Sequence, residues 1–579
     1  MKHILIAIFF VHLSFPIFAQ TKSNTWNPNQ KNGYYKNPII DADYSDPDVC
    51  RVGNDYYMTS SSFACFPGLP ILHSTDLVNW EIIGHALTDD YPVLTEYQGT
   101  EIDWRKKIQH GNYVWAPSIR YHDGWFYIFC GDPDQGLFMT KTQDPAGTWE
   151  PLVWVMKGKG LIDCCPLWDE DGRAYLSHGC AGSRAGIKSV LLVAPMSPAG
   201  TKIIGPSRIV YDGHEDQPTI EGTKFYKRNG YYYIMSPAGG VKYGWQVELR
   251  SKNPFGPYEE YVGLAQGNVK TVNGPHQGAW VDTQNGEDWF LHFQDKHAYG
   301  RVVHLQPAKW VDDWLVIGED KNGDGCGEPV LTWKKPNLPF SGDFQPAEDD
   351  DFDSTELGKQ WQFEGPYSYY WYFCDAKHSK LRLYGVQQPD GYRNLSDLQN
   401  AILQKFPTEN FIATAKVRFI PNPDYKNKGE EAGMIVKGLD YAALKFVTTK
   451  EGCVLRLVTC EKAFEGNTET IVEEIPVELS PLPSPYTQKY AVDDIPQPRS
   501  ATKDYYFRVK VQSAGFANNI ISSAQFYYST DGKKFQKLGN PFTVKEGKWI
   551  GAKLGFYNSR PTKNNDGAFF DVDYIHFDK

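Results

Sequence analysis

A hairpin-forming unit recurs five times in the first half of the chain. Its first copy, DYSDPDVCRVGNDYYM from Asp43 to Met58, joins an acid and a proline to a strand, a Gly-Asn-Asp turn and a second strand. The other copies begin near residues 116, 165, 220 and 277. Four of the five turns contain Asn-Gly or Asp-Gly, the strongest short-range signal for a β-hairpin because both central positions need positive φ.

The spacing of these units predicts the architecture of the first domain. Successive copies begin roughly 50 to 70 residues apart, within reach of the period of a propeller blade. From residue 37 to 333 short strands alternate with turn signals, and no heptad pattern or amphipathic helix is evident. We therefore expect an all-β propeller. A jelly roll or a large sandwich is the alternative, since alternating strands can produce repeats this weak.

A change of composition near residue 336 indicates a second domain. The stretch KKPNLPFSGDFQPAEDDDFD is rich in proline and acids, as linkers are. Beyond it, runs such as FIATAKVRFI and YYFRVKVQ alternate with period two, which predicts a two-sheet β-sandwich of jelly-roll type. The expected boundaries are a propeller at 30–335, a linker at 336–350 and a sandwich at 351–579.

The N-terminus has the features of a secretory signal peptide. Residues 1–19, MKHILIAIFFVHLSFPIFA, place an early lysine before a short apolar core and a small residue. The alternative, a membrane anchor, is disfavoured because His12, Ser14 and Pro16 interrupt the apolar run. We expect an exported protein, periplasmic or extracellular, without a membrane span.

Composition narrows the choice of partner. The formal net charge of −11 argues against nucleic acid and anionic membranes, which clustered Lys and Arg would bind. The ten cysteines show no CxxC pair and predict buried small hydrophobes, with one or two disulfides as the lesser alternative. Aromatic residues make up 15% of the chain, which is compatible with sugar-stacking platforms or with ordinary strand propensity.

Carboxylates at the heads of the repeated units are the candidate catalytic groups. Asp46 heads the first unit, Asp163 lies just ahead of the third, and Glu221 heads the fourth. Innermost strands of a propeller line its central channel, so the three side chains could converge. Each alone could be an ordinary turn or surface residue. Together they indicate glycoside hydrolysis, in which one carboxylic acid protonates the leaving oxygen and another carboxylate acts on the sugar or its attacking water.

Five stretches of the first domain carry a resemblance: NPIIDADYSDPDV, VWAPSIRYHDGWFYIF, GLIDCCPLWDEDGRAYL, TIEGTKFYKRNGYYYI and GRVVHLQPAKW. They resemble the successive motifs of glycoside hydrolase family 43. The resemblance implies a five-bladed β-propeller that acts on arabinose- and xylose-containing polysaccharides. The later stretches DDFDSTELGKQWQF and DVDYIHF resemble the concanavalin-like sandwich of the xylosidase-type branch, in which a sandwich loop partly closes the pocket.

The resemblance implies a role for each carboxylate. Asp46 falls on the general base of the family's Asp-Pro motif, Asp163 on the residue that orients the acid and tunes its pKa, and Glu221 on the general acid. The family inverts configuration, which calls for a carboxyl separation of roughly 6.5 to 9.5 Å. Asp48 shares a strand face with Asp46, and we expect its change to Asn to matter much less.

Five further positions match the family's substrate contacts. Arg301 matches its sugar-binding arginine, while Trp115, Phe63 and Phe66 match its aromatic wall. A surface salt bridge is the alternative for Arg301, and an ordinary core position is the alternative for each aromatic residue. His276 falls on its axial histidine, for which we expect a water-mediated role rather than a metal. The sequence departs from the family's commoner Ile-Asp-Pro form at Asp163-Cys164-Cys165-Pro166, which affects the local turn.

No cofactor is expected. The run from Asp320 to Gly325 matches the start of a calcium loop, but Leu331 stands where a bidentate Glu is required. A plain acidic turn is the favoured interpretation, and a structural calcium ion is the minor one.

The resulting hypothesis is an inverting exo-glycosidase that releases β-D-xylose or α-L-arabinofuranose from plant cell-wall polysaccharide or its oligosaccharides. The alternatives are a non-catalytic polysaccharide-binding propeller and an endo-acting arabinanase of the same family. The presence of all three carboxylates argues against the non-catalytic alternative.

Overall fold

The computed structural model describes residues 23–88, 107–267, 273–340, 342–424, 429–483, 499–515, 520–562 and 567–579. The predicted signal peptide at 1–19 lies outside these residues. Strands dominate the described chain, and its α-helix α2 (Gly182–Ala185) has four residues. Within the described ranges, no helix has the length and apolar character needed to cross a membrane. All ten cysteines lie in these ranges, and all are free thiols.

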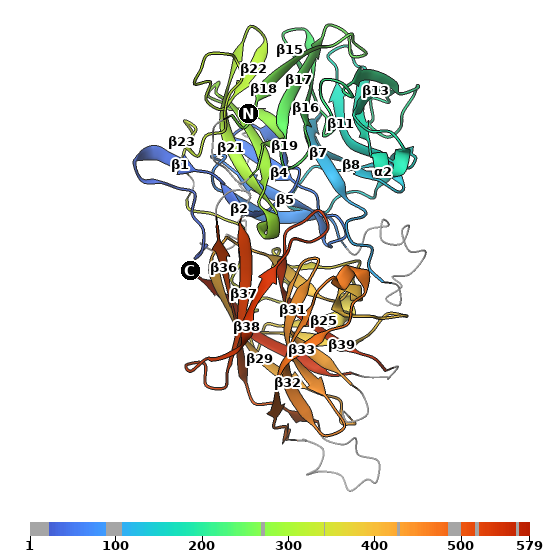
Figure 1. The fold of residues 1–579 in the computed structure, drawn as a ribbon. Coiled ribbons are helices and arrows are strands. Elements are labelled where there is room, and N and C mark those ends of the chain that lie inside the picture. The colour runs from blue at the N-terminus through green and yellow to red at the C-terminus, as the bar shows by residue number, and fades with distance from the viewer. Residues whose placement is uncertain are drawn as a thin grey trace, which may run out of the picture.

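The first domain is a ring of five antiparallel sheets (Figure 1), the blades of a propeller. Blade 1 has strands β3 (Asp48–Val52), β4 (Asp55–Thr59), β5 (Gly68–Ser74) and β6 (Glu81–Leu87). Blade 2 has β7 (Trp115–His122), β8 (Trp125–Asp132), β9 (Gly136–Thr142) and β10 (Val153–Lys157). Blade 3 has β11 (Leu161–Trp168), β12 (Ala174–Cys180), β13 (Val190–Met196) and β14 (Arg208–Asp212). Blade 4 has β15 (Lys224–Arg228), β16 (Tyr231–Ala238), β17 (Trp245–Ser251) and β18 (Glu259–Leu264).

Blade 5 closes the ring with a strand from the other end of the domain. Its strands β19 (His276–Asp282), β20 (Asp288–Asp295) and β21 (Arg301–Val311) are joined by β2 (Ile40–Asp43), which pairs with β21. The short strand β22 (Trp314–Ile317) pairs with the far end of β21. Because β2 precedes blade 1 in sequence, its pairing with blade 5 ties the first and last blades together.

The five predicted hairpins are the first two strands of the five blades. Asp123-Gly124 and Asn229-Gly230 have positive φ at both turn positions, as the sequence predicts. In the turns at Gly172 and Gly286, only the glycine has positive φ. Those two loops are therefore wider turns than the expected two-residue type, although they connect the same strands.

The second domain is a two-sheet sandwich, as predicted, and all its described strand pairs are antiparallel except β27 (Val386–Gln387) with β39 (Lys553–Arg560). One sheet has the order β24 (Gln362–Phe363), β28 (Ile402–Lys405), β39, β30 (Glu431–Lys437), β31 (Tyr441–Thr448), β32 (Cys453–Cys460) and β33 (Thr470–Val477), with β27 beside β39. The other has the order β25 (Tyr372–Asp375), β26 (Lys380–Tyr384), β40 (Phe569–Asp578), β29 (Phe411–Ile420), β36 (Tyr505–Ala514), β37 (Ile521–Ser529) and β38 (Gln536–Val544).

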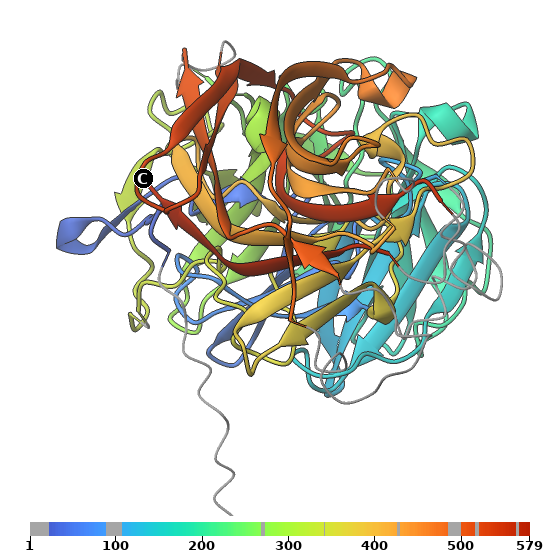
Figure 2. The ribbon, with the colours of Figure 1, turned by 90° about the horizontal axis from the view of Figure 1, so that it is seen from below.

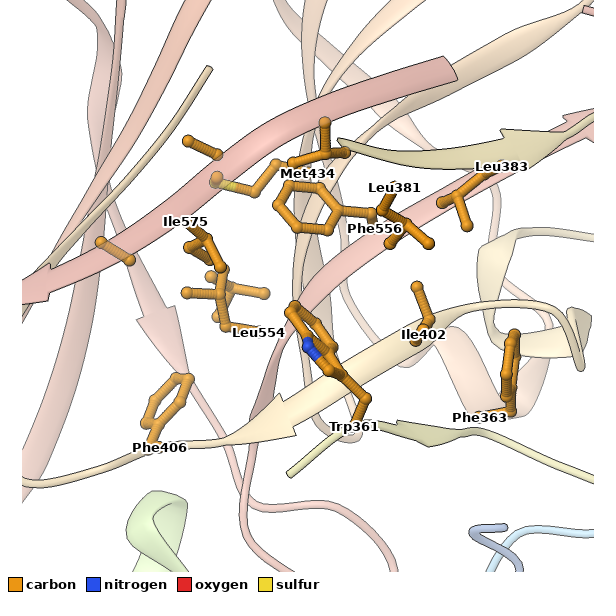
Figure 3. Close-up of a cluster of buried hydrophobic side chains, with 14 of the residues drawn as sticks. Trp361, Phe363, Leu381, Leu383, Ile402, Phe406, Met434, Leu554, Phe556 and Ile575 are labelled. Carbon is orange, nitrogen blue, oxygen red and sulfur yellow. The ribbon is translucent and has the colours of Figure 1, made fainter. Parts of the chain in front are cut away.

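Alternation along the sandwich strands builds the core between the two sheets. In β36, Phe507, Val509 and Val511 are buried, while Arg508 and Lys510 between them are only partly covered. Figure 3 shows how side chains from many strands meet in this core, with Trp361 and Phe556 packed side by side at a ring distance of 6.0 Å. The period-two pattern in the sequence is therefore the pattern of burial.

The sandwich packs against one face of the propeller (Figures 1 and 2). Phe66 of blade 1 and Phe363 of β24 exchange two backbone hydrogen bonds, of 3.0 and 2.6 Å. Thr408 donates a hydrogen bond to Asp41 of β2, whose other oxygen lies 2.5 Å from the ammonium group of Lys296. One hydrophobic cluster contains residues of both domains, so the two domains share a core.

Candidate active site

A pocket of about 130 Å³ opens at the end of the innermost strands. This volume is below the ≈ 300–1,000 Å³ of a pocket for a drug-sized ligand, so the site suits a small group such as one sugar ring. The pocket is lined by Asp46, Phe63, Trp115, Ala116, Ile162, Asp163, Glu221, Val241, His276, Gln277, Arg301 and Trp549.

Most of these residues occupy equivalent positions in the five blades. The innermost strands are β3, β7, β11, β15 and β19. Contacts run from β19 through β3, β7 and β11 to β15, and β19 packs against β16 of blade 4. In blades 2, 3 and 5, a bulge near the start of the innermost strand interrupts its pairing with the second strand. The corresponding residue has positive φ in every blade: Asp46 (54°), Ala116 (39°), Asp163 (58°), Gly222 (66°) and Gln277 (30°).

This shared backbone geometry explains why two of the predicted carboxylates are aspartates. Among residues other than glycine, Asn and Asp adopt positive φ with the smallest penalty. Glu221 lies one position earlier, beside Gly222, and therefore needs no positive φ itself. The third repeated unit aligns on Asp163 rather than on Cys165-Pro166, because Asp163 is the bulged residue of β11. The unusual Cys164-Cys165 pair leaves the aspartate in place.

Asp46 is held by a cation and a hydroxyl group. Arg301 Nη1 lies 3.1 and 3.4 Å from its two carboxylate oxygens, and Ser61 Oγ donates a hydrogen bond of 2.5 Å to Oδ2. Ser61 in turn accepts a bond of 2.7 Å from the N–H of Ala116 in the next blade. Both Asp46 and Arg301 are buried, so Arg301 is not the surface ion-pair residue that its sequence alone would allow. The positive charge of Arg301 therefore lies directly against the carboxylate of Asp46 inside the pocket.

Glu221 and Asp163 lie in a different environment from Asp46, because each has at least one other carboxylate among its charged neighbours. Burial raises the pKa of Glu221 well above its usual range, and the nearby charges of Asp163 and Asp46 raise it further. Burial and the charge of Asp46 also raise the pKa of Asp163, against the lowering effect of the Gly222 N–H, which donates a hydrogen bond of 2.8 Å to Asp163 Oδ2. The side chain of Glu221 is 37% exposed and faces the pocket. A protonated Glu221 can therefore meet a ligand there.

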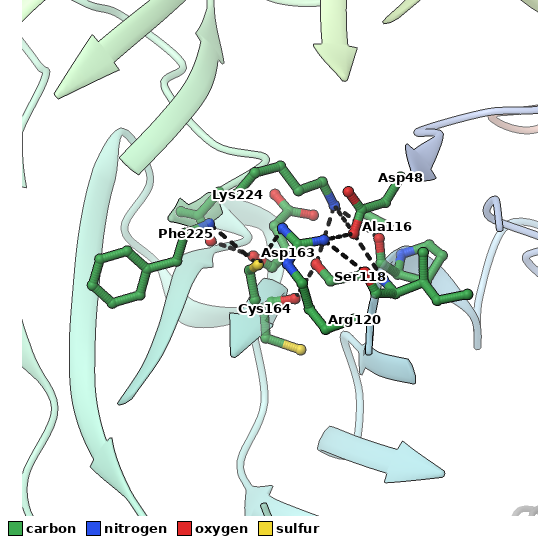
Figure 4. A network of polar contacts seen from close by, with 12 residues as sticks. Asp48, Ala116, Ser118, Arg120, Asp163, Cys164, Lys224 and Phe225 are labelled. Atoms are coloured by element: carbon green, nitrogen blue, oxygen red, sulfur yellow. Dashed lines mark hydrogen bonds and ion pairs between the residues drawn. The ribbon is translucent and has the colours of Figure 1, made fainter. Parts of the chain in front are cut away.

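A buried polar network around Lys224, Asp48 and Arg120 lies beside Asp163 (Figure 4). Lys224 is fully buried, and its ammonium group donates to Pro117 O (2.8 Å) and Ser118 Oγ (3.1 Å). Asp48 accepts bonds of 2.7 Å from Ile119 N and 2.6 Å from Arg120 Nη1. Asp48 is absent from the pocket lining and connects blades 1 and 2 instead. Because Asp48 is fully buried, its change to Asn should affect stability, while the expectation that the change matters much less for catalysis stays a prediction.

His276 lies in the pocket, 3.9 Å from Glu221. Burial, together with Arg301 and His292, lowers the pKa of His276 to about 3, so its ring is neutral. Neither ring nitrogen has a hydrogen-bond partner among the described residues. Across the same residues, no group of three or more His, Cys, Asp or Glu side chains has an arrangement for a metal ion.

The aromatic wall differs from the prediction at one position. Phe63 and Trp115 line the pocket, with ring centroids 6.4 Å apart. Phe66 does not, because the chain turns it into the interdomain core, where it is fully buried against Tyr113. The prediction that Phe66 contacts substrate is therefore wrong.

Trp549 is the pocket residue that sequence reasoning missed. It belongs to the sandwich loop between β38 and β39, and its ring centroid lies 6.3 Å from that of Trp115. The loop docks on the propeller through the N–H of Ala552, which donates a hydrogen bond to Ala298 O. The resemblance predicts that such a loop partly closes the pocket, but no local signal distinguishes Trp549 from the other tryptophans.

The acidic run near residue 320 forms a compact turn. Both carboxylate oxygens of Asp320 accept backbone hydrogen bonds, from Gly323 and Gly325, and Asp324 accepts one from Cys326. Such bonds are those of the plain acidic turn that the sequence favours. The minor alternative, a structural calcium ion, stays a prediction.

A five-bladed propeller with three carboxylates around one axial pocket defines a glycoside hydrolase of the propeller class. Residues 35–315 match the model of glycosyl hydrolases family 43, and residues 349–578 match the β-xylosidase C-terminal concanavalin A-like domain. The chain is 35% identical over 544 residues to a putative β-xylosidase of Xylanibacter ruminicola, covering 93% of this chain and 89% of that protein. The chain therefore belongs to glycosyl hydrolase family 43.

Further relatives agree with this assignment. A non-reducing end α-L-arabinofuranosidase, BoGH43B, of Bacteroides ovatus is 34% identical over 426 residues, covering 70% of this chain and 74% of its own. The solved structure of Bacteroides ovatus xyloglucan PUL GH43B has a TM-score of 0.72 and 26% identity, covering 94% of this chain and 99% of that one. The predicted fold class, a five-bladed propeller followed by a concanavalin-like sandwich, and the predicted enzyme class are confirmed.

Proposed function

We propose that the protein is an inverting exo-glycosidase that removes terminal β-D-xylosyl or α-L-arabinofuranosyl residues from plant hemicellulose and its oligosaccharides. The relatives with the printed names β-xylosidase and α-L-arabinofuranosidase support this substrate class. The small pocket, walled on one side by Trp549, favours a chain end over an internal sugar. An endo-acting arabinanase would need a groove open at both ends.

The observation that carries the mechanism is the contrast between Asp46 and Glu221. Asp46 is paired with Arg301 and so is suited to be the base, whereas the raised pKa of Glu221 suits it to be the acid. In the proposed reaction a water molecule attacks the anomeric carbon, and Asp46 accepts the proton of that water. Glu221 donates its proton to the glycosidic oxygen as the bond to the anomeric carbon breaks. The released sugar has inverted configuration.

Asp163 and Arg301 have supporting parts in this scheme. The charge of Asp163 raises the pKa of Glu221, and its bond to the Gly222 N–H fixes the backbone beside the acid. Arg301 orients Asp46, and its remaining N–H groups can donate to sugar hydroxyls. Phe63, Trp115 and Trp549 offer apolar surface to the ring.

A leaving-group comparison tests the assignment of Glu221. Glu221→Gln should lower the turnover of xylobiose or an arabinoxylan oligosaccharide by about 10²- to 10⁴-fold, since their alkoxide leaving groups need a proton. Dinitrophenyl glycosides need little protonation and should lose far less. Glu215→Gln, at an exposed position in the loop before Glu221, is the matched control. Equal losses on both substrate types would exclude Glu221 as the acid, and net retention of configuration by NMR would refute the two-carboxylate scheme.

We also propose that the enzyme is exported to the periplasm or the medium. The signal-like sequence of residues 1–19 supports this proposal. Fractionation of expressing cells and N-terminal sequencing of the mature protein test it, with a start near Gln20 as the expected result.

A further inference from the structure

A second cavity, of about 680 Å³, lies between the propeller and the sandwich. It is lined by residues of both domains, among them His85, Trp149, Trp361, Phe363, Tyr367 and Tyr372. None of its lining residues belongs to the catalytic pocket. Its volume lies in the range typical of ligand sites and is several times that of the catalytic pocket.

The segment that borders this cavity also exposes aromatic side chains. Tyr369 and Tyr370 lie in the short helix η3 (Tyr369–Trp371), between the lining residues Tyr367 and Tyr372, and are 73% and 59% exposed. Phe373 in β25 is 51% exposed. Single exposed aromatics are ordinary, but several beside a cavity mark an interaction site. Tyr367 and Tyr372 line the cavity, and the exposed Tyr369 and Tyr370 lie between them in sequence.

The polar groups of the cavity favour an uncharged ligand that forms hydrogen bonds. Trp149 is 3% exposed, and its indole N–H has no hydrogen-bond partner among the described residues. Burial lowers the pKa of His85 to about 3, so its imidazole is neutral at physiological pH. The charged residues of the described lining are Glu356 and Lys359, whose opposite charges sum to zero. A buried donor without a partner is costly and is satisfied when a ligand hydroxyl reaches it.

We propose that this interdomain cavity and its tyrosine rim form a second glycan-binding site, which holds a neutral segment of the hemicellulose chain away from the catalytic pocket. Sugar rings combine apolar C–H faces, which pack on aromatic rings, with hydroxyl groups, which the indole N–H and the neutral imidazole can bind. The choice of hemicellulose as ligand rests on the proposed function. The site would raise the affinity for polymer without touching the bond that is cut.

Affinity electrophoresis in gels containing soluble arabinoxylan tests this site. The Tyr369→Ala/Tyr370→Ala variant should bind the polymer about ten-fold more weakly than the parent, since two stacking platforms are lost. Both proteins carry Asp46→Asn so that the polymer is not shortened during the run. Phe340→Ala, at a site in the linker with the same 59% exposure as Tyr370, is the control and should migrate like the parent. Trp149→Phe is a second variant, which removes the unpartnered donor and keeps an aromatic ring.

Hydrolysis of aryl xyloside and aryl arabinofuranoside by the variants with Asp46 intact separates this inference from the catalytic proposal. We expect unchanged kcat and KM on these small substrates together with the loss of polymer retardation. Equal retardation of the double variant and its parent would overturn the second site, whatever the activity. Absence of hydrolysis of both aryl glycosides by the wild type, with retardation intact, would leave the site standing and refute the proposed function.

Discussion

The backbone N–H of Gly222 donates a hydrogen bond of 2.8 Å to Asp163 Oδ2. The bond crosses from blade 4 to blade 3 and fixes the residue that follows Glu221. Asp163 therefore acts on Glu221 in two ways, through its charge and through the backbone. The two effects can be separated by mutation, because the first needs a carboxylate and the second needs only an oxygen atom.

Asp163→Asn should shift the pH profile of the enzyme. Glu221 works in its protonated form, and the negative charge of Asp163 raises its pKa. An amide oxygen can still accept the Gly222 bond, but the charge is gone, so the pKa of Glu221 falls. The alkaline limb of kcat should move to lower pH by about one pH unit. Asp216→Asn, at an exposed site, is the control, and an unmoved alkaline limb would disprove the tuning role.

Gly222→Ala should reduce activity through geometry. Gly222 has φ of 66°, and a Cβ there would lie 2.8 Å from Pro237 Cδ and 2.9 Å from Gln277 Cδ. We expect kcat to fall at least ten-fold and the free energy of unfolding to fall by about 1–3 kcal/mol. Gly230→Ala is the matched control, since Gly230 has φ of 73° in the turn of the same blade and only the Lys252 ammonium group near its Cβ position, at 3.9 Å. Comparable loss of kcat in the control would contradict the argument.

Asp48→Asn should mainly lower stability, whereas Asp46→Asn should mainly lower turnover. Asp48 is a fully buried partner of Arg120, so its neutralisation should lower the free energy of unfolding by about 3 kcal/mol. The kcat of the folded fraction should stay within a few-fold of wild type. Asp46→Asn should lower kcat by about 10²-fold or more. Denaturant titration and kinetics on the same samples check both, and a fully active Asp46→Asn variant would eliminate Asp46 as the base.

Trp549→Ala should weaken substrate binding more than it slows the reaction. Trp549 is 45% exposed and contributes to the pocket rather than to a core, so the melting temperature should change little. We expect KM for an aryl glycoside to rise about five- to ten-fold with a smaller change in kcat. Trp549→Phe should restore most of the affinity. An unchanged KM would show that the sandwich supplies no part of the substrate site.

The sequence predicts the blades better than it predicts the pocket. Turn chemistry such as Asp123-Gly124 and Asn229-Gly230 is local, so the hairpins could be found from neighbouring residues alone. The positive φ of Asp46 and Asp163 is also a local property that aspartate tolerates. Their presence in one pocket depends on the ring, which the repeat indicates and the resemblance specifies.

The errors arise where the tertiary structure decides. Phe63 and Phe66 are both apolar and three residues apart, and only the docking of the sandwich determines that Phe66 enters the shared core. Asp46 and Asp48 are two residues apart, yet one faces the pocket and the other Arg120. Trp549 reaches the pocket from a different domain, so no pattern around it could assign its role.

The pairing of β2 with β21 has a consequence for the time course of folding. The N–H of Arg301 bonds to Asp43, which lies 258 positions earlier in the chain. Contacts between such distant segments form slowly, because a long loop must close before the contact is made. During synthesis, β2 leaves the ribosome long before its partner exists, so the propeller can close only after all five blades have emerged. Until then the unpaired strand β2 is an exposed edge open to chaperones.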